Sequence, residues 1–438
     1  MTTLSRSTPR IYYGWYVLAV AAFGAFLSAG TAQLFMSTML LPMSDELGWS
    51  RTAATGAVTA GTLTGGLLSP WIGRLVDRYG PRPLTTLGAL ILAGAQFLLA
   101  AVDQLWQLYI AYIVGRAVAS TTLSGVVPST AATNWFRRKR GRALGIVAMA
   151  IPLGVSTLAV LAQGIIEQFG WRAVFIAYGA VTAVALAPLA ALVLRRHPED
   201  LGLRPDGEPT PPSMAGQASE HQRSGRPVVE EERSWTLAEA QRTRTLWLLI
   251  AASALGVLAN TAVGYHQVGY YTGVGLAASE AVLALSVYSL AGAFASGLWG
   301  WLTERYSERL LAALVMVLAA LSVAYLLVVR DLPGALLFAV AFGVTSRGEG
   351  TLTNIIVAQY FGRRAYGSIQ GFMYPFTMVG LGTGPFVGSV GLDLTGSYAA
   401  VLVGGIAAFL GTALLFWLAR QPGRPPAPPT CRKSVRPG

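Results

Sequence analysis

Two ionisable residues lie near the middle of an otherwise apolar stretch, AVAFGVTSRGEGTLTNIIVAQYF, which runs from Ala339 to Phe361. Arg347 and Glu349 are separated there by one glycine. An ionised side chain at bilayer depth costs roughly 2.5–3.5 kcal/mol on insertion scales, so such residues usually serve a function. A guanidinium group can grip a carboxylate through two hydrogen bonds, and a carboxyl group can carry a proton. The pair therefore predicts an anion-binding residue, Arg347, and a proton carrier, Glu349.

The spacing of the two residues bears on whether they pair with each other. Residues two apart on an α-helix are separated by about 200° around its axis, so they do not share a face. We expect one side chain to face a cavity and the other to contact a different helix. A structural ion pair remains the alternative, because Gly348 and Gly350 can loosen the backbone between them.

Other polar side chains interrupt apolar runs elsewhere in the chain. They are Gln33, Ser37, Thr38, Arg116, Asn260, Tyr265, His266 and Asn354. Of these, Gln33, Arg116, Asn260, Tyr265 and His266 join Arg347 as candidate substrate-binding residues. His266 is also a second candidate for proton coupling, because imidazole titrates near physiological pH. A hydrogen-bonded residue that only packs helices together is the alternative for His266.

Composition indicates the elements that must position these residues. Hydrophobic residues make up 53% of the 438 residues and charged residues 12%, and the mean hydropathy is +0.53. A soluble domain averages about a quarter charged residues, so the chain has too little polar surface for a soluble fold. Spans of about 20 apolar residues cross a bilayer as helices, which predicts an all-α polytopic membrane protein. Twelve spans are expected, at 14–41, 52–73, 83–101, 106–134, 141–166, 171–194, 245–271, 279–302, 309–328, 333–360, 366–391 and 397–419.

The basic residues predict the orientation of these spans. With a cytoplasmic N-terminus, all but five of the 32 Lys and Arg residues lie in cytoplasmic segments. The five are Arg51, Arg172 and Arg330 in outer segments and Arg116 and Arg347 within spans. The positive-inside rule therefore places both termini in the cytoplasm of a multi-pass protein of the cell membrane. Basic loops facing anionic lipid headgroups account for the net charge of +12, so no nucleic-acid partner is expected.

The chain divides into two similar halves. We expect a first six-helix half at 1–196, a polar cytoplasmic linker at 197–244, a second six-helix half at 245–420 and a cytoplasmic tail at 421–438. Residues 235–244 within the linker are expected to form a short amphipathic helix. The loop GRLVDRYGPR (73–82) after the second span recurs as GWLTERYSER (300–309) after the eighth. A repeat at half-chain spacing is typical of parallel six-helix repeats.

The first of these loops resembles the signature of the major facilitator superfamily, G-x-x-x-D-R-x-G-x-[RK]. The matching residues are Gly73, Asp77, Arg78, Gly80 and Arg82. The second copy carries Glu304 and Arg305 at the positions of the acid and the arginine. Further resemblances lie in VGRAVAS (114–120) and GLGTGPFVG (380–388). Within the superfamily the chain is similar to the branch of monocarboxylate transporters and oxalate/formate antiporters, through YYGWYV (12–17), ELGWSR (46–51), FGWRAVF (169–175) and GPFVGSVGLDLTGSY (384–398).

The resemblance implies roles for the loop residues and a place for the substrate. An acid at the C-terminal end of its own helix is unfavourable there, but it is stabilised beside the N-terminus of another helix. Asp77 is expected beside the start of span eleven and Glu304 beside the start of span five, closing a cytoplasmic gate. Gly73, Arg78, Arg82 and Arg305 belong to the same predicted gate. A topology anchor without gating is the alternative for these loops. The resemblance also implies a central cavity lined by spans one, four, seven and ten.

Three functions follow in order of preference. The first is a secondary transporter that works by alternating access and carries a small organic anion, such as a monocarboxylate, together with protons. The second is efflux of drugs or other amphiphiles, favoured by the aromatic residues Tyr265, Tyr270, Tyr271, Phe372, Tyr374 and Phe376. The third is a membrane sensor that does not transport. The chain has neither an ATP-binding loop motif nor a catalytic or metal-ligand constellation, so we expect no enzyme activity, no metal and no cofactor.

Overall fold

The computed structural model describes residues 11–207 and 235–423. The middle of the predicted linker and most of the predicted tail, including Cys431, therefore lie outside the described residues. The described part of the first half contains α1 (Tyr13–Ser28), α2 (Gln33–Leu47), α3 (Arg51–Tyr79), α4 (Pro81–Ala100), α5 (Leu105–Val118), α6 (Val126–Trp135), α7 (Arg140–Val181) and α8 (Ala187–Val193). The second half contains α11 (Arg244–Gly273), α12 (Ala278–Leu302), α13 (Glu308–Leu326), α14 (Leu332–Ser346), α15 (Gly348–Phe361), α16 (Tyr366–Thr395) and α17 (Tyr398–Leu418).

Several predicted spans are interrupted helices. A 3-10 turn, Ala29–Thr31, separates α1 from α2, and a π-helical turn, Ala119–Leu123, follows α5. The tenth span divides at Arg347 into α14 and α15. In contrast, α7 continues through two predicted spans and bends at Gly170, whose φ of 78° an L side chain rarely adopts. The helix boundaries thus differ from the predicted spans, whereas the number of passes does not.

Eight helical stretches of the described chain are long and apolar enough to cross a membrane by length and composition. One of them, Arg140–Val193, contains two passes. The three predicted passes missing from this set are α3, the α14 and α15 pair, and α16, which are rich in glycine and hydroxyl residues or divided at Arg347. The all-α fold with twelve membrane helices in two halves is therefore confirmed.

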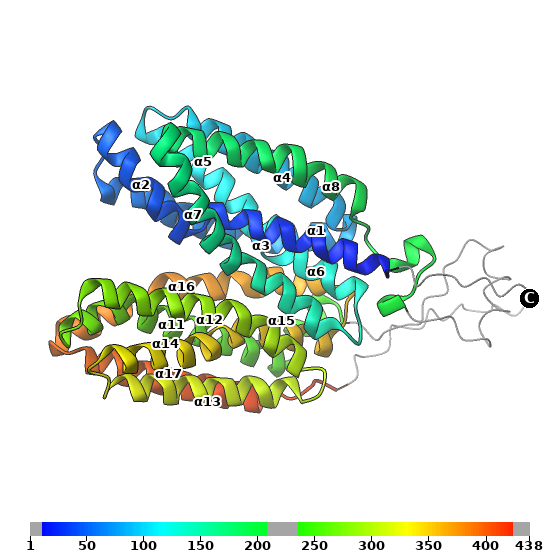
Figure 1. Cartoon of the computed structure of the whole chain (residues 1–438). Helices are drawn as coiled ribbons and strands as arrows, with labels where there is room; N and C mark the ends of the chain where they lie inside the picture. The colour runs from blue at the N-terminus through cyan, green and yellow to red at the C-terminus, as the bar shows by residue number, and fades with distance from the viewer. Residues whose placement is uncertain (1–10, 208–234, 424–438) are drawn as a thin grey trace, which may run out of the picture.

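The two halves lie side by side and meet unevenly (Figure 1). We call the end of the molecule where residues 11 and 423 lie the terminal end, and the opposite end the distal end. The halves converge near the terminal end and diverge toward the distal end (Figure 1). Near the terminal end, the Ser69 hydroxyl of α3 donates to the Gly371 carbonyl of α16 at 3.0 Å. Farther along α16, Gly380 and Gly388 instead face Ala254 and His266 of α11, within their own half.

Small residues allow the close approach of the halves at the terminal end. A Cβ atom on Gly73 would lie 2.1 Å from the carbonyl oxygen of Gly367. The same holds for α7 and α12, where a Cβ atom on Gly141 would lie 2.2 Å from the carbonyl oxygen of Gly300. Small residues at membrane-helix interfaces permit this backbone contact. Gly73 therefore acts through close packing at the seam between the halves.

The end of the linker is folded as expected. Within residues 235–244 the chain forms α10 (Leu237–Gln241), which begins with a capping box. The Thr236 hydroxyl accepts from the Glu239 main-chain N–H at 3.3 Å, and the Glu239 carboxylate accepts from the Thr236 main-chain N–H at 2.8 Å. The main-chain N–H of Trp235 donates to the Phe361 carbonyl at 2.9 Å. This contact ties the linker to the end of α15.

Candidate functional site

A cavity of about 460 Å³ lies between the two halves. The first half contributes residues of α6, α7 and the turn before α6, and the second half contributes residues of α11, α12, α14, α15 and α16. Hydroxyl and amide side chains dominate its polar lining: Ser124, Ser129, Asn260, Thr261, Ser296, Ser346, Thr351, Asn354, Gln370 and Thr377. Arg347 and Glu349 are its ionisable lining residues, and Tyr374 is its aromatic one. The cavity is therefore suited to a polar ligand.

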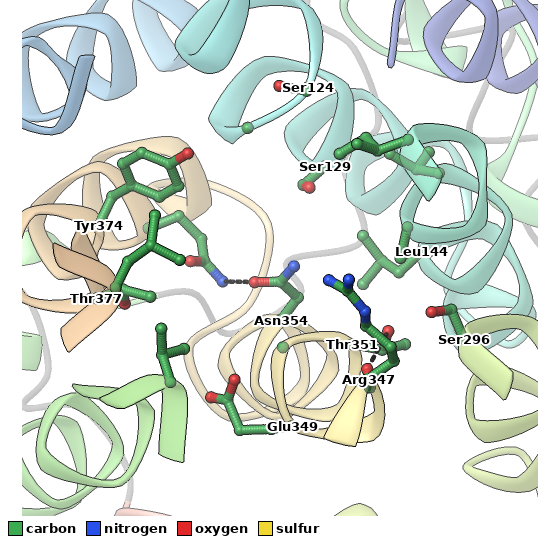
Figure 2. A pocket seen from close by; sticks show the side chains of 18 of the residues that line it. Ser124, Ser129, Leu144, Ser296, Arg347, Glu349, Thr351, Asn354, Tyr374 and Thr377 are labelled. Atoms are coloured by element: carbon green, nitrogen blue, oxygen red, sulfur yellow. Dashed lines mark hydrogen bonds between the residues drawn. The ribbon is translucent and has the colours of Figure 1, made fainter. Parts of the chain in front are cut away.

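Helix α15 presents two different faces to its surroundings. Arg347, Thr351 and Asn354 follow the i, i+4, i+7 spacing of one helix face, and all three line the cavity. Figure 2 shows the Arg347 guanidinium and the Asn354 amide projecting to the same side of the helix, with Glu349 pointing elsewhere. The separation expected from the two-residue spacing of Arg347 and Glu349 is thus present.

The guanidinium group of Arg347 borders the cavity. Its side chain is exposed, and its guanidinium group forms no ion pair with any residue in the described ranges. Its aliphatic stem packs against α12, where a Cβ atom built on Gly292 would lie 2.6 Å from the Arg347 Cγ. Gly292 therefore makes room for the stem, and the guanidinium group borders the cavity without an ion pair to any described residue.

Glu349 also borders the cavity, but its carboxyl group is enclosed against α11. Its side chain is 6% exposed. The Ser253 hydroxyl of α11 donates to its Oε1 at 2.9 Å, and the Thr353 hydroxyl donates to the same atom at 3.2 Å. No cation pairs with the carboxyl group within the described part of the chain. The structural ion pair with Arg347 is therefore absent, and hydroxyl groups alone satisfy this carboxyl group.

Arg116 lies beside the cavity and is not part of its lining. Its side chain is half-buried on α5, with Cβ packed near Gly61 of α3. Its Nε atom is buried without a hydrogen-bond partner among the described residues. Arg116 therefore packs against α3 within the first half, outside the cavity lining.

The remaining predicted binding residues separate into two groups. Asn260 lines the cavity, and its Oδ1 accepts from the Tyr288 hydroxyl at 3.4 Å. His266 does not line it, because the ring is 9% exposed and its Nε2 lies 3.2 Å from the Pro385 carbonyl oxygen. Tyr265 is 66% exposed and also lies outside the cavity lining. The side chain of Gln33 lies outside the described residues.

His266 and Tyr265 have surroundings that differ from those of the cavity-lining residues. The His266 ring projects from α11 and packs against α16, where a Cβ atom on Gly388 would lie 2.6 Å from it. The centre of the ring lies 6.2 Å from that of Tyr398 on α17. Tyr265, one residue earlier, is turned about 100° away around the helix. The helix-packing alternative for His266 therefore fits its surroundings better than a role in substrate binding or proton coupling.

The two acids of the predicted gate meet the opposite half at the terminal end. The Asp77 carboxylate accepts from the main-chain N–H groups of Gly367 and Ser368, at 2.9 and 2.6 Å. These groups belong to the first turn of α16, where the partial positive charge of the helix dipole favours an acid. The Glu304 carboxylate accepts from Arg142 in the first turn of α7, at 2.9 Å. Both acids therefore stand beside the helix ends expected from the sequence.

The basic residues of the two loops make other contacts. The guanidinium group of Arg78 lies 5.2 Å from the ring centre of its neighbour Tyr79, and that of Arg305 lies 4.5 Å from the ring centre of Trp301. These two side chains and that of Arg82 are exposed. In this conformation, none of the three has an ion pair to the opposite half within the described chain. These two loops therefore contact the opposite half through their acids and glycines.

Sequence reasoning missed further contacts across the seam. Arg363, just before α16, donates to the Asn134 carbonyl of α6 at 3.2 Å and pairs with Glu199 of the linker at 2.5 Å. Arg140 of α7 is buried and donates to the Ala358 carbonyl of α15 at 2.8 Å. Arg140 lies in the loop WFRRKRGRALG (135–145) after span four, and Arg363 lies in the loop YFGRRAYGSIQG (360–371) after span ten. The similarity of these two basic loops was the signal that could have identified them.

Comparison with known proteins identifies the class. The family model of the Major Facilitator Superfamily matches residues 21–276 and 258–436. The chain belongs to the Major Facilitator Superfamily and is therefore a membrane transporter of that family. The membership accounts for the two helical halves and for the cavity between them.

Individual relatives fit the same class. The chain is 24% identical to the oxalate:formate antiporter of Oxalobacter formigenes over 424 residues, which cover 96% of this chain and 95% of that protein. It is 27% identical to monocarboxylate transporter 9 of Mus musculus over 179 residues, covering 40% of this chain and 34% of the relative. Its fold is similar to FucP of E. coli in the outward conformation, with a TM-score of 0.67, 14% identity, and coverage of 94% and 100%.

Proposed function

We propose that the protein is a proton-coupled transporter of a small organic anion, such as a monocarboxylate. The observation that carries this proposal is the exposed guanidinium group of Arg347, which faces a polar cavity between the halves without an ion pair to any described residue. A fixed positive charge at bilayer depth is costly unless it serves a ligand or a partner. The names of the relatives, an oxalate:formate antiporter and a monocarboxylate transporter, support the same substrate class.

The proposal includes an orientation and a transport state. With both termini in the cytoplasm of a cell-membrane protein, the terminal end is the inner end. Contacts of Asp77, Glu304, Arg140 and Arg363 then seal the cavity from the cytoplasm, and the diverging distal end faces outward (Figure 1). Transport requires this seal to open after the substrate binds, as alternating access demands.

Replacing Asp77 by asparagine should slow transport several-fold without preventing membrane insertion. The amide accepts at most one of the two N–H groups of α16 through its oxygen, and the charge at the helix N-terminus disappears. A hydrogen bond to a charged group contributes roughly 1.5–3 kcal/mol, so the sealed state loses a large part of its stability. Initial uptake rates, normalised to inserted protein, measure the effect.

The Glu304→Gln variant is the matched control for the gate. It removes one partly exposed ion pair, which is worth about 1 kcal/mol or less, so transport should slow less than in Asp77→Asn. Wild-type rates in Asp77→Asn at normal insertion would show that Asp77 does not contribute to the gate.

Gly292→Ala should weaken ligand binding while leaving the helix intact. The new Cβ atom would lie 2.6 Å from Arg347 Cγ and 3.1 Å from the Gly343 carbonyl oxygen, so the arginine stem must move. Alanine favours an α-helix over glycine by about 1 kcal/mol, so lost helix propensity cannot explain weaker binding. We expect about a tenfold rise in Kd, consistent with a partly lost charged hydrogen bond.

A titration of carboxylates into the Gly292→Ala protein measures this effect. Gly264→Ala on α11 is the control, because a Cβ atom there meets no other atom within 4 Å. Unchanged affinity in Gly292→Ala, or an equal loss in the control, would contradict the packing account of Arg347.

We propose Glu349 as the proton carrier. It lines the cavity, it is held by two hydroxyl groups, and no cation within the described chain neutralises it. Moving an ionised carboxylate into an enclosed, low-dielectric site is unfavourable, so protonation would accompany its enclosure. The Ser253 hydroxyl on α11 can hydrogen-bond to Glu349 in either protonation state, because a hydroxyl group donates to a carboxylate and accepts from a carboxylic acid.

Efflux of amphiphiles has less support from the positions of the aromatic residues. The Tyr270 hydroxyl donates to the Leu326 carbonyl at 2.7 Å, and Tyr271 is buried. Phe372 and Phe376 pack against Trp247 with ring centres 6.0 and 6.2 Å away. Of the six aromatic residues that favoured efflux, Tyr374 alone lines the cavity.

A screen of ligand-induced stabilisation tests the proposed substrate class. The full chain in detergent is heated with short carboxylates or with cationic dyes, and the midpoint of unfolding is recorded. A ligand at 100 times its Kd should stabilise the protein by about 2.7 kcal/mol. Stabilisation by carboxylates supports the proposal, whereas stabilisation by cations alone would contradict it.

A further inference from the structure

We infer that Asn354 is a second recognition residue, and that the substrate carries a second hydrogen-bond acceptor besides the carboxylate bound by Arg347. This inference rests on the proposed function and narrows its substrate class. Asn354 lines the cavity, and a hydrogen bond from Gln370 orients its side-chain amide. The class is a short aliphatic carboxylate with a hydroxyl, oxo or second carboxylate oxygen.

The side-chain amide of Asn354 is oriented by its neighbours. The Gln370 amide donates from Nε2 to Asn354 Oδ1 at 2.9 Å and to the Tyr366 hydroxyl at 3.2 Å. The Tyr366 hydroxyl in turn donates to the main-chain carbonyl of Asn354 at 3.4 Å. Because the Tyr366 proton is used in this way, its oxygen accepts from Gln370. This network assigns Oδ1 of Asn354 as an acceptor toward Gln370 and leaves its Nδ2 as the free end.

The free end of the amide points to the ligand space. Asn354 is half-buried and lines the cavity, and Figure 2 shows its nitrogen turned away from the Gln370 hydrogen bond, on the side of the Arg347 guanidinium. No described residue accepts a hydrogen bond from this nitrogen. An amide NH₂ group has two donors, so a bound ligand can complete the pattern with an oxygen atom.

One ligand can contact both residues. Arg347 and Asn354 are seven residues apart, which corresponds to about 10 Å between their Cα atoms along the helix, and both side chains project to the same side of α15 (Figure 2). A short acyclic carboxylate with a second acceptor group can therefore accept from both residues. A plain alkyl carboxylate would satisfy Arg347 and leave the Asn354 donors unpaired, which is unfavourable in an enclosed site.

Three four-carbon probes test the inference on the purified full chain: butanoate, 4-hydroxybutanoate and succinate. Their Kd values are measured by calorimetry on the wild type and on Asn354→Leu, Gln370→Glu and Arg347→Gln. The wild type should prefer 4-hydroxybutanoate or succinate over butanoate by about tenfold or more. In Asn354→Leu, which keeps the volume and removes the donors, this preference should disappear while the Kd for butanoate stays within about twofold.

The Gln370→Glu variant tests the orientation and guards against misfolding of the leucine variant. A carboxylate at position 370 would accept from the Asn354 NH₂ group, so that Oδ1 faces the cavity. The added charge weakens all three anions, but the preference for a second acceptor should also be lost. Retention of butanoate binding in Asn354→Leu shows that the cavity is folded.

Other results would contradict either the role of Asn354 or the proposed anion clamp. Equal wild-type affinities for the three probes, or a preference that survives both the Asn354 and the Gln370 variants, would overturn the role of Asn354. Unchanged binding in Arg347→Gln would instead overturn the proposed anion clamp. Absence of binding by all three probes would overturn both.

Discussion

Replacing Arg347 by glutamine is expected to abolish carboxylate binding and transport. The guanidinium group faces the cavity and has no ion pair among the described residues, so the variant removes the anion's counter-charge without stranding a buried acid. A hydrogen bond to a charged group contributes roughly 1.5–3 kcal/mol, and each 1.4 kcal/mol is about a tenfold change in affinity. Loss of a bidentate pair therefore places binding beyond the range of a normal titration. Unchanged transport in Arg347→Gln would contradict the clamp.

Two further variants separate charge from geometry. Arg347→Lys keeps the charge and loses the planar, bidentate donor group, so affinity should fall roughly tenfold to a hundredfold, as expected for one charged hydrogen bond. A double variant that neutralises Arg347 and Glu349 should still fail to bind. If the double variant instead folded better than either single variant, the two residues would form a structural pair in the membrane, contrary to the hydrogen bonds of Glu349 to Ser253 and Thr353.

Replacing Glu349 by glutamine is expected to abolish accumulation driven by a pH gradient while substrate exchange continues. Glutamine keeps the shape and can still accept from Ser253, but it cannot take up or release a proton. Exchange needs only the return of a loaded carrier, whereas accumulation needs the proton to move with the substrate. Uptake and counterflow in proteoliposomes, with and without a pH gradient, distinguish the two processes.

Retained accumulation in Glu349→Gln would exclude Glu349 as the proton carrier. His266→Ala would then be the next variant to test. From its contact with Pro385 and its place outside the cavity lining, we expect His266→Ala to lower stability and to leave the response to the pH gradient intact.

The sequence predicted the helices well because hydropathy determines which segments lie in a bilayer. The interruptions at Ala29–Thr31 and at Arg347 were harder to predict, because an apolar run has the same composition whether its helix is continuous or broken. Asp77 was placed correctly beside α16, because a repeated loop and the helix dipole together specify its partner. In such cases, a local motif and a physical preference point to the same contact.

The cavity was only partly predictable from the sequence. Arg347 and Glu349 were conspicuous because charge is rare in apolar runs, but the direction of each side chain depends on neighbouring helices. His266 was equally conspicuous, yet it packs against Pro385 and not in the cavity. Ser253 and Gln370 were missed, because serine and glutamine are unremarkable at a helix face until the structure brings Ser253 to Glu349 and Gln370 to Asn354.

We propose above all that the protein moves an organic anion together with protons. The most direct measurement is uptake into proteoliposomes that contain the full chain, in which radiolabelled short carboxylates and a cationic dye are compared with and without a pH gradient. We expect a carboxylate to accumulate, its accumulation to disappear when the gradient is dissipated, and Arg347→Gln vesicles to take up none. Uptake of the dye with no uptake of any carboxylate, or carboxylate uptake that persists unchanged in Arg347→Gln vesicles, would contradict the proposed function.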